Sequence, residues 1–465
     1  MRIRSLLYYA VSLFIVVLLA NGAFAQTTMS QTFAQTTMSQ TSTAPRDSLT
    51  LEECIQLALQ NKADVKIAHD QVRMADAQLE AAWGNFLPSV NFSLRGSRNV
   101  QGEGRRFFSG LEFTAPASTR EYYSSGLSLS QPIFTGGRLL NNRKYAMLNS
   151  QQADIGYANT KEQVIMDVVS AYFQVLRARE FVRVYESTLE SSQAQVDLVK
   201  ERYNLGAVAQ SDVYKAQTQA GNDRINLLQQ QNTLATQKRN LNLMMGREPM
   251  TPVVLPEFDY TSPEIPDEET AQQQAVRTNR NLEQYRLDVE MSRANVAIAR
   301  SSLMPSVSAS FGYDRSGFLM ADLYRELDKN WSYSLGVNLS VPIFNRLQTR
   351  TQMATRKYQL STAQQRYQDA ELSVKMQVDN LIQQLKTYNE IISLNEINLQ
   401  SAEEDLRLAK ERYNIGQATL LDVLDAQASL TNAQRILVYA KFDAKTQEAQ
   451  LQAAMGELLS NRTGQ

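Results

Sequence analysis

Residues 200–206 read KERYNLG and residues 410–416 read KERYNIG, so one heptapeptide occurs twice with a single conservative change. The two copies start at positions 200 and 410, which are 210 residues apart. Two further pairs keep that separation: SQPIF and SVPIF at 130–134 and 340–344, and Met-Gly at 245–246 and 455–456. Several matches in one register indicate an internal duplication of the chain. A duplication reveals architecture and does not by itself reveal function.

Long helices are predicted on either side of the repeated heptapeptide. Proline is absent from residues 133–248 and 343–465, and because proline breaks helix interiors, these intervals permit very long helices. A helix over 138–204 would extend about 100 Å at 1.5 Å per residue, and its apolar residues recur at spacings of three, four and seven. Each repeat therefore predicts a helical hairpin, with short apolar tips at 204–212 and 414–422.

The segments before the long helices have a different period. In residues 331–344, WSYSLGVNLSVPIF, apolar side chains occupy the odd positions from Trp331 to Ile343, and small or polar residues occupy the even positions from Ser332 to Pro342. This period of two predicts a β-strand with one apolar face. Segments 88–96, 123–134 and 305–313 alternate in the same way. Lengths of about ten residues suit a tilted strand that crosses a bilayer, although a half-buried sheet in a soluble protein gives the same alternation.

Four strands are too few to close a membrane barrel, because single-chain barrels begin at about eight strands. An open sheet edge in lipid would leave backbone hydrogen-bonding groups unsatisfied. The chain is therefore expected to share a barrel with copies of itself, and physics alone does not choose between two copies and three. The connections at 96–121 and 314–330 are interpreted as polar loops outside the cell.

The N-terminus carries an export signal. Arg2 and Arg4 precede an uncharged apolar run, and Ala23-Phe24-Ala25 gives the small-x-small pattern of a signal peptidase site. Residues 1–25 are therefore predicted to be a cleaved signal peptide. Residues 26–48 form a polar, low-complexity leader, in which a second cleavage site after Ala34 is possible.

Composition excludes several functional classes. The 47 basic and 48 acidic residues give a net charge of −1, which does not favour a nucleic-acid partner. One Cys and one His exclude a Cys/His zinc site and a disulfide within the chain. No catalytic residue, cofactor or metal site is predicted, and the protein is not expected to be an enzyme. Cys54, which lies near Leu51 and Ile55, is interpreted as a helix-packing residue.

The chain resembles the TolC family of outer-membrane efflux and secretion channels over nearly its whole mature length. The resemblance rests on LTLEEC at 49–54, QPIF with Gly-Gly at 131–137, the paired RYNxG tips that start at 202 and 412, and LDVLDA at 421–426. It implies a mainly α fold with a membrane β-barrel, in which a homotrimer in outer-membrane lipid combines a twelve-strand barrel with a periplasmic α-helical tunnel. The implied divisions are repeat 1 at 49–246, an equatorial linker at 247–269, repeat 2 at 270–458 and a tail at 459–465.

The resemblance also implies a function at the tips. Family members act as passive exit ducts of tripartite efflux or type I secretion systems, with a periplasmic adaptor (membrane fusion) protein and an inner-membrane pump. The adaptor meets an apolar residue followed by glycine at each tip. The matching positions here are Leu205 with Gly206 and Ile415 with Gly416. A helix end that is capped by glycine and has a hydrophobic contact fits the same residues.

Other positions match the closing gate of the family, which presents carboxylates to the lumen and is held by polar bonds near the tips. Asp422 and Asp425 match the carboxylates and share a helix face, so three copies would bring six carboxylates to one ring. The polar bonds are matched by Ser211, Asp212 and Tyr413. A solvated helix face is the ordinary alternative for such an aspartate pair. The arginine often found after the second tip is replaced by Ala418, so how the closed state is locked stays open.

Two other classes compete with the export duct. A simple diffusion porin would need eight or more strands in each chain and no long helices. An envelope coiled-coil structural protein accounts for the heptads but not for the membrane-type strands. Drugs, metals and polypeptides all remain possible as cargo, and so does any class of pump.

Overall fold

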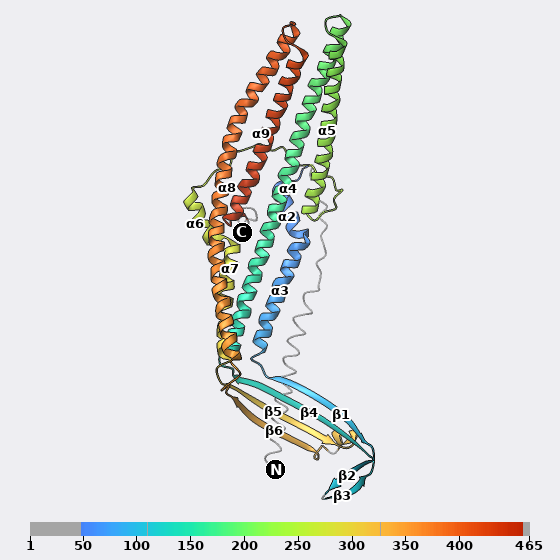
Figure 1. Cartoon of the computed structure of the whole chain (residues 1–465), viewed down its shortest axis with the longest axis vertical. Helices are drawn as coiled ribbons and strands as arrows, with labels where there is room; N and C mark the ends of the chain where they lie inside the picture. The colour runs from blue at the N-terminus through green and yellow to red at the C-terminus, as the bar shows by residue number, and fades with distance from the viewer. Residues whose placement is uncertain (1–47, 109, 326, 459–465) are drawn as a thin grey trace. The chain divides into compact units, whose positions relative to one another are not determined.

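The computed structural model describes residues 48–108, 110–325 and 327–458. The predicted signal peptide, nearly all of the leader and the predicted tail lie outside the described residues. The described chain consists of long helices and an antiparallel sheet, and the two helical hairpin tips lie at the end away from that sheet (Figure 1). Within the described ranges, no helix has an apolar stretch long enough to cross a bilayer.

Two pairs of long helices match each other in length. Helices α4 (Arg138–Asn204) and α8 (Gln348–Asn414) have 67 residues each, and α5 (Gln210–Met244) and α9 (Leu420–Ala454) have 35 each. The starts of α8 and α9, at 348 and 420, lie 210 residues after those of α4 and α5, at 138 and 210. This is the separation found between the repeated motifs. The helix predicted at 138–204 agrees with α4 at both ends.

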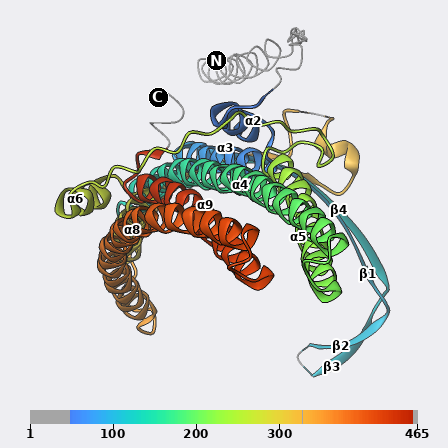
Figure 2. The ribbon, with the colours of Figure 1, turned by 90° about the horizontal axis from the view of Figure 1, so that it is seen from above.

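Four shorter helices complete the layer: α2 (Leu51–Asn61), α3 (Ala63–Gly84), α6 (Glu268–Thr278) and α7 (Arg280–Ser301). Near the sheet the order of neighbours is α3, α4, α7, α8, and near the tips it is α5, α4, α9, α8. Figure 2 shows that α5, α4, α9 and α8 lie along an arc. The edges of the layer are therefore α3 and α5 on one side and α8 on the other.

Helices α5 and α9 each end in a glycine that packs against a junction between two shorter helices. Gly246 and Gly456 follow α5 and α9, with φ of +67° and +72°. A Cβ at Gly246 would lie 2.9 Å from the Cβ of Asn61, and one at Gly456 would lie 2.7 Å from the carbonyl oxygen of Thr278. Helix α5 therefore ends against the junction of α2 and α3, and α9 ends against the junction of α6 and α7. Both junctions lie so close that only glycine fits.

The main sheet is antiparallel, with the order β1 (Ser89–Gln101), β4 (Ser118–Phe134), β5 (Ser306–Gly317), β6 (Trp331–Ser340). Residues paired across neighbouring strands lie on the same face. One row joins Phe92, Leu127, Tyr313 and Tyr333, and the next joins Val90, Leu129, Phe311 and Leu335. The opposite face carries small polar rows such as Ser89, Ser130, Ser310 and Gly336. The predicted alternation is confirmed, and the apolar face is continuous across all four strands.

The strand ends differ from the sequence prediction. β1 and β4 continue to Gln101 and Ser118 because backbone pairing carries on through polar residues, among them Arg98 opposite Glu121. The residues between them include a second hairpin, β2 (Gly104–Phe108) and β3 (Leu111–Ala115), where a polar loop was expected. β6 ends at Ser340, four residues early, because Pro342 lacks the N–H that would extend the ladder.

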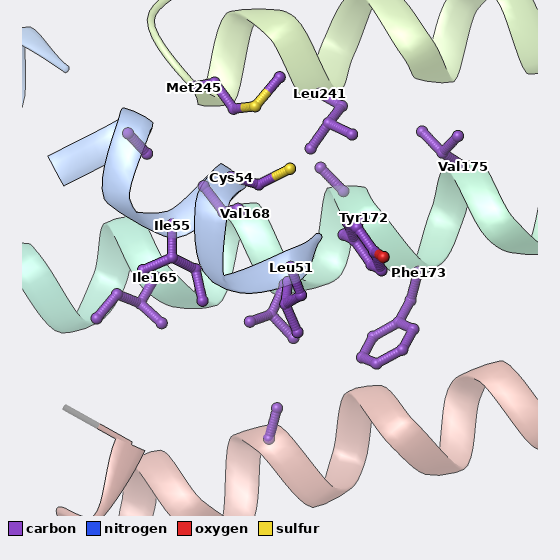
Figure 3. Packing of buried hydrophobic residues seen from close by; sticks show 14 of the residues in the cluster. Leu51, Cys54, Ile55, Ile165, Val168, Tyr172, Phe173, Val175, Leu241 and Met245 are labelled. Carbon is purple, nitrogen blue, oxygen red and sulfur yellow. The ribbon is translucent and has the colours of Figure 1, made fainter. Parts of the chain in front are cut away.

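The core lies where α2 packs on α4 and on the end of α5. Thr50 and Glu53 form a capping box that starts α2 and directs Cys54 into this core. Cys54 is fully buried, and Figure 3 shows its sulfur near Leu241 and Met245. Burial raises the pKa of its thiol to about 12. The interpretation of Cys54 as a packing residue is confirmed.

Residues 247–267 hold the middle of the helical layer. The Arg179 guanidinium on α4 donates to the carbonyl oxygens of Leu255 and Pro256 at 2.9 and 3.0 Å. The ring of Phe258 lies 5.6 Å from Phe173 on α4 and 5.5 Å from Phe442 on α9. This segment therefore ties the two hairpins together at mid-length.

Candidate channel tips and gate

The turns at the two hairpin tips are built in the same way. In the first, the N–H of Gly206 donates to the Tyr203 carbonyl at 2.8 Å, and that of Ala207 to the Arg202 carbonyl at 2.9 Å. The second tip repeats this pattern around Gly416, with distances of 3.1 and 2.8 Å. The glycine φ values are +74° and +77°, and a Cβ at either position would meet no atom within 4 Å. Glycine therefore serves the backbone turn here, since it leaves the space around it open.

Each tip exposes a large apolar side chain directly before its turn glycine. Leu205 is 83% exposed and Ile415 is 69% exposed, and each directly precedes the turn glycine. These are the residues that the sequence singled out for docking. Because both side chains are exposed, neither makes the hydrophobic contact that often accompanies a glycine-capped helix end. Their apolar surface is therefore available to a partner.

Arg202 joins the first tip to the second. Its guanidinium donates to the carbonyl oxygens of Tyr413 and Asn414, both at 2.8 Å, and to the Asn414 side-chain oxygen at 3.2 Å. It also lies 4.5 Å from the centre of the Tyr413 ring. The two backbone acceptors are carbonyls at the C-terminal end of α8, where a cation is favoured by the helix dipole. A single side chain thus caps α8 and holds both tips together.

An apolar cluster lies behind these bonds and draws on all four helices. Its buried members are Val196, Val199, Val213, Ala216, Ala220, Leu406, Ala409, Tyr413, Leu420, Val423 and Ala426. Alanine supplies four of the eleven, and such small side chains let the helix backbones approach closely. The hairpins are therefore packed against each other directly behind the tips.

A polar seam between α4 and the second hairpin continues from this cluster toward the sheet. The Lys410 ammonium donates to the Ser191 hydroxyl, which donates to the Gln427 side chain, each at 2.9 Å. The hydroxyls of Thr188 and Thr431 lie 3.2 Å apart. Burial lowers the pKa of Lys410. Each of these contacts is short range, so separating the hairpins would break them together.

The two predicted gate carboxylates lie near the start of α9. Asp422 completes a capping box, because its carboxylate accepts from the N–H and hydroxyl of Thr419 at 2.7 and 2.8 Å. These bonds hold the pKa of Asp422 below its usual value. Asp425 lies one turn further along, and both side chains are exposed while Val423 and Ala426 face the cluster. The structure therefore brings the pair to one solvent-facing side of α9.

The other three predicted gate residues are not joined by hydrogen bonds to one another. Ser211 is exposed in the first turn of α5, and the Asp212 carboxylate pairs with Lys215 at 3.4 Å. Tyr413 is buried, and its hydroxyl has no hydrogen-bond partner among the described residues. Burial raises the pKa of Tyr413, and the neighbouring Arg202 guanidinium partly offsets that rise. The bonds between the tips run through Arg202 instead.

Sequence reasoning missed Arg202 because both tips contain the same motif. Arg412 occupies the equivalent position in the second tip, where it is exposed and its charge acts on Asp422. Two identical residues in duplicated surroundings give no sign of which one reaches across. The only available signal was that a cation in the last turn of a helix can cap a neighbouring helix end.

The edges of the helical layer expose apolar side chains along their length. On the α3 and α5 edge they include Ile67, Met74, Ile225 and Leu228, and on α8 they include Tyr358, Leu372, Met376 and Ile397. Single exposed apolar residues are ordinary, but rows of them on opposite edges indicate surfaces that other protein covers.

Comparison with known proteins agrees with this arrangement. A family model described as "Outer membrane efflux protein" matches residues 54–247 and 271–457. The pyoverdine export outer membrane protein OpmQ of Pseudomonas aeruginosa is 26% identical over 417 residues, which cover 87% of this chain and 83% of OpmQ. The outer membrane protein TolC of Vibrio cholerae is 26% identical over 347 residues, or 72% of this chain and 77% of that protein. The crystal structure of the outer membrane protein VceC from Vibrio cholerae shares the fold, with a TM-score of 0.75 at 21% identity, and the match covers 87% of this chain and 96% of that one.

Proposed function

The chain belongs to the outer membrane efflux protein family, and from that premise we propose that it is the outer-membrane exit duct of a tripartite efflux or type I secretion system. The family consists of passive outer membrane channels, so the chain is not an enzyme. In this proposal an inner-membrane pump supplies the energy. A periplasmic adaptor engages the tips and opens the duct at that end.

The observation that carries the proposal is that the sheet and the helical layer both end in open edges. β1 and β6 each have one neighbour in the sheet, and their free backbone groups would be costly in lipid. Three copies of a four-stranded sheet close a barrel of twelve strands. The same three copies bring α8 of one chain against α3 and α5 of the next, which covers the apolar edges and closes a tunnel. Because of the internal repeat, each chain contributes two similar helical hairpins to that tunnel wall.

In this proposal the tips provide adaptor docking and closure of the duct. Leu205 and Ile415 provide exposed apolar surface next to glycine turns that have open space around them, which suits docking of an adaptor hairpin. In this proposal Asp422 and Asp425, which share an exposed side of α9, line the closed aperture. Arg202 holds the two hairpins of one chain together, which gives the closed state a lock that does not need the arginine replaced by Ala418.

Two measurements test this proposal. Mass determination in mild detergent should give three copies, and a stable monomer with fully protected strand amides would contradict the shared barrel. For the tips, a cysteine at Leu205 or Ile415 in a Cys54→Ala background should crosslink to a purified adaptor from the same organism. Met250→Cys is the matched control, because Met250 is equally exposed but lies in the mid-length segment. Equal crosslinking at Met250 would refute docking at the tips.

A further inference from the structure

The connection between β5 and β6, residues 318–330, is a compact unit held by one buried side chain. Arg315 is 5% exposed, and its Nη2 donates to the carbonyl oxygens of Asp322, Arg325 and Lys329 at 3.1, 3.0 and 3.2 Å. A 3-10 turn, η1 (Met320–Leu323), opens the connection. Because a single guanidinium ties three points of the backbone together, the connection keeps a defined shape.

Two positions on β5 show which face of the sheet this connection covers. Phe311, Tyr313, Arg315 and Gly317 are two residues apart along β5, so all four lie on the apolar face. The Arg315 side chain reaches the carbonyls of the connection on that face. A Cβ at Gly317 would collide with the side chain of Asp322. Both observations place residues 322–329 against the apolar face of β5, whereas Phe318, the first residue of the connection, packs its ring 6.4 Å from that of Tyr122 on the polar face of β4.

The outward surface of the connection is rich in large apolar residues, although the sequence analysis interpreted it as a polar loop. Phe318, Leu319, Met320, Tyr324 and Leu327 are between 45% and 70% exposed, as are Trp331 and Tyr333 at the start of β6. Two basic residues, Arg325 and Lys329, and three acidic residues, Asp322, Glu326 and Asp328, are interspersed among them in the sequence. Aromatic rings are typical of the boundary between acyl chains and head groups in a membrane.

We propose that residues 318–330 are an interfacial anchor that seats in the outer leaflet of the outer membrane, at the boundary between acyl chains and head groups. The proposal rests on the barrel proposed above, because the apolar strand face would then meet lipid and the anchor continues that face at the strand ends. Arg315 fixes the backbone in advance, so membrane contact does not have to order the segment. The apolar side chains enter the acyl region, while the charged side chains of the segment stay at the level of the head groups.

The test measures the depth of labels in the assembled protein. Single cysteines replace Leu319 or Leu327 in a Cys54→Ala background and carry an environment-sensitive fluorophore. Purified trimers are placed in phosphatidylcholine–phosphatidylglycerol vesicles whose lipids are brominated near the head group. Leu335→Cys, in an apolar row of β6, is the membrane benchmark, and Asn91→Cys, on the polar face of β1, is the matched control.

We expect the bromolipids to quench labels at 319 and 327 at least as strongly as the label at 335, and to leave the label at 91 unquenched. If the label at 335 is quenched but those at 319 and 327 are quenched only by aqueous iodide, the connection lies in water and the anchor is refuted. If those two labels are shielded from both quenchers, the connection packs against another copy, which also refutes it. If the label at 335 is not quenched, the barrel proposal fails and the anchor fails with it.

Discussion

Replacing Arg202 with alanine should loosen the closed tips without unfolding the chain. The substitution removes three hydrogen bonds from a charged donor, at 2.8, 2.8 and 3.2 Å, and the contact with the Tyr413 ring. Bonds from charged donors contribute about 1.5–3 kcal/mol each where they are buried, and a cation over an aromatic ring contributes about 0.5–1 kcal/mol at exposed sites. Arg202 is only half-buried, so we reduce the sum to about 2 kcal/mol per chain.

A loss of about 2 kcal/mol corresponds to about a thirty-fold shift in the equilibrium between joined and separated hairpins. The assay is the conductance of single trimers in planar bilayers, in which the Arg202→Ala variant should spend a larger share of time open. Arg412→Ala is the matched control, because it removes the same side chain from the equivalent position in the other tip. Thermal unfolding followed by circular dichroism should be nearly unchanged for both variants, since the apolar cluster behind the tips is intact.

The result that would refute this reasoning is equal behaviour of the two variants. If Arg202→Ala and Arg412→Ala open the trimer to the same extent, the effect comes from charge at the tips and not from the bridge. If Arg202→Ala keeps the wild-type closed fraction, the hairpins are held by the cluster and the polar seam alone. Arg202→Lys keeps the charge but loses the forked geometry, so it should fall between wild type and alanine.

Four further predictions concern the tips and the core. Asp422→Asn with Asp425→Asn should reduce cation selectivity and block by multivalent cations from the periplasmic side, since an acidic constriction concentrates cations; unchanged selectivity would show that the pair does not line the aperture. Gly206→Asp with Gly416→Asp should abolish export while trimers still reach the outer membrane, because a side chain at positive φ distorts both docking turns; normal export would reduce the tips to simple turns. The pKa of Asp422 is lowered in the folded chain, so its capping contribution is present above the ordinary aspartate range and is lost as the pH falls through the lowered value. The protection of amides in the first turn of α9 against hydrogen exchange, measured relative to the intrinsic exchange rate at each pH, should therefore fall on acidification, and this fall should be absent in Asp422→Asn. Cys54, with a pKa raised to about 12, should resist alkylation in folded trimers and react once they are unfolded, and rapid labelling of folded trimers would contradict its burial.

Most of the helical fold could be predicted from the sequence because its signals are local. The proline-free intervals and the turn glycines fix where α4 starts and ends, and alternation identifies strands such as β6 in which one face is apolar. Strand extension by polar pairing left no such signal. Arg98 and Glu121 are charged, and only the pairing of β1 with β4 brings them opposite each other.

The connection at 318–330 was misread for a related reason. Its apolar residues follow no period of two or 3.6, since a buried guanidinium rather than a helix or strand organises them. The candidate site was predicted in part. The turn glycines and exposed apolar residues follow from the tip motif, whereas the role of Arg202 depends on how two duplicated hairpins are placed in space.

The position of the core along α4 has a mechanical consequence. From Tyr172, in the core held by α2, to Asn204 at the tip, α4 runs 32 residues, which is about 48 Å at 1.5 Å per residue. If α4 is held at this core, its outer part can rotate about that point as a rigid rod. A swing of about 5° there carries the tip about 4 Å sideways, which is more than the length of any bond that Arg202 makes. In the proposed channel, a swing of this size at the tips would widen the aperture.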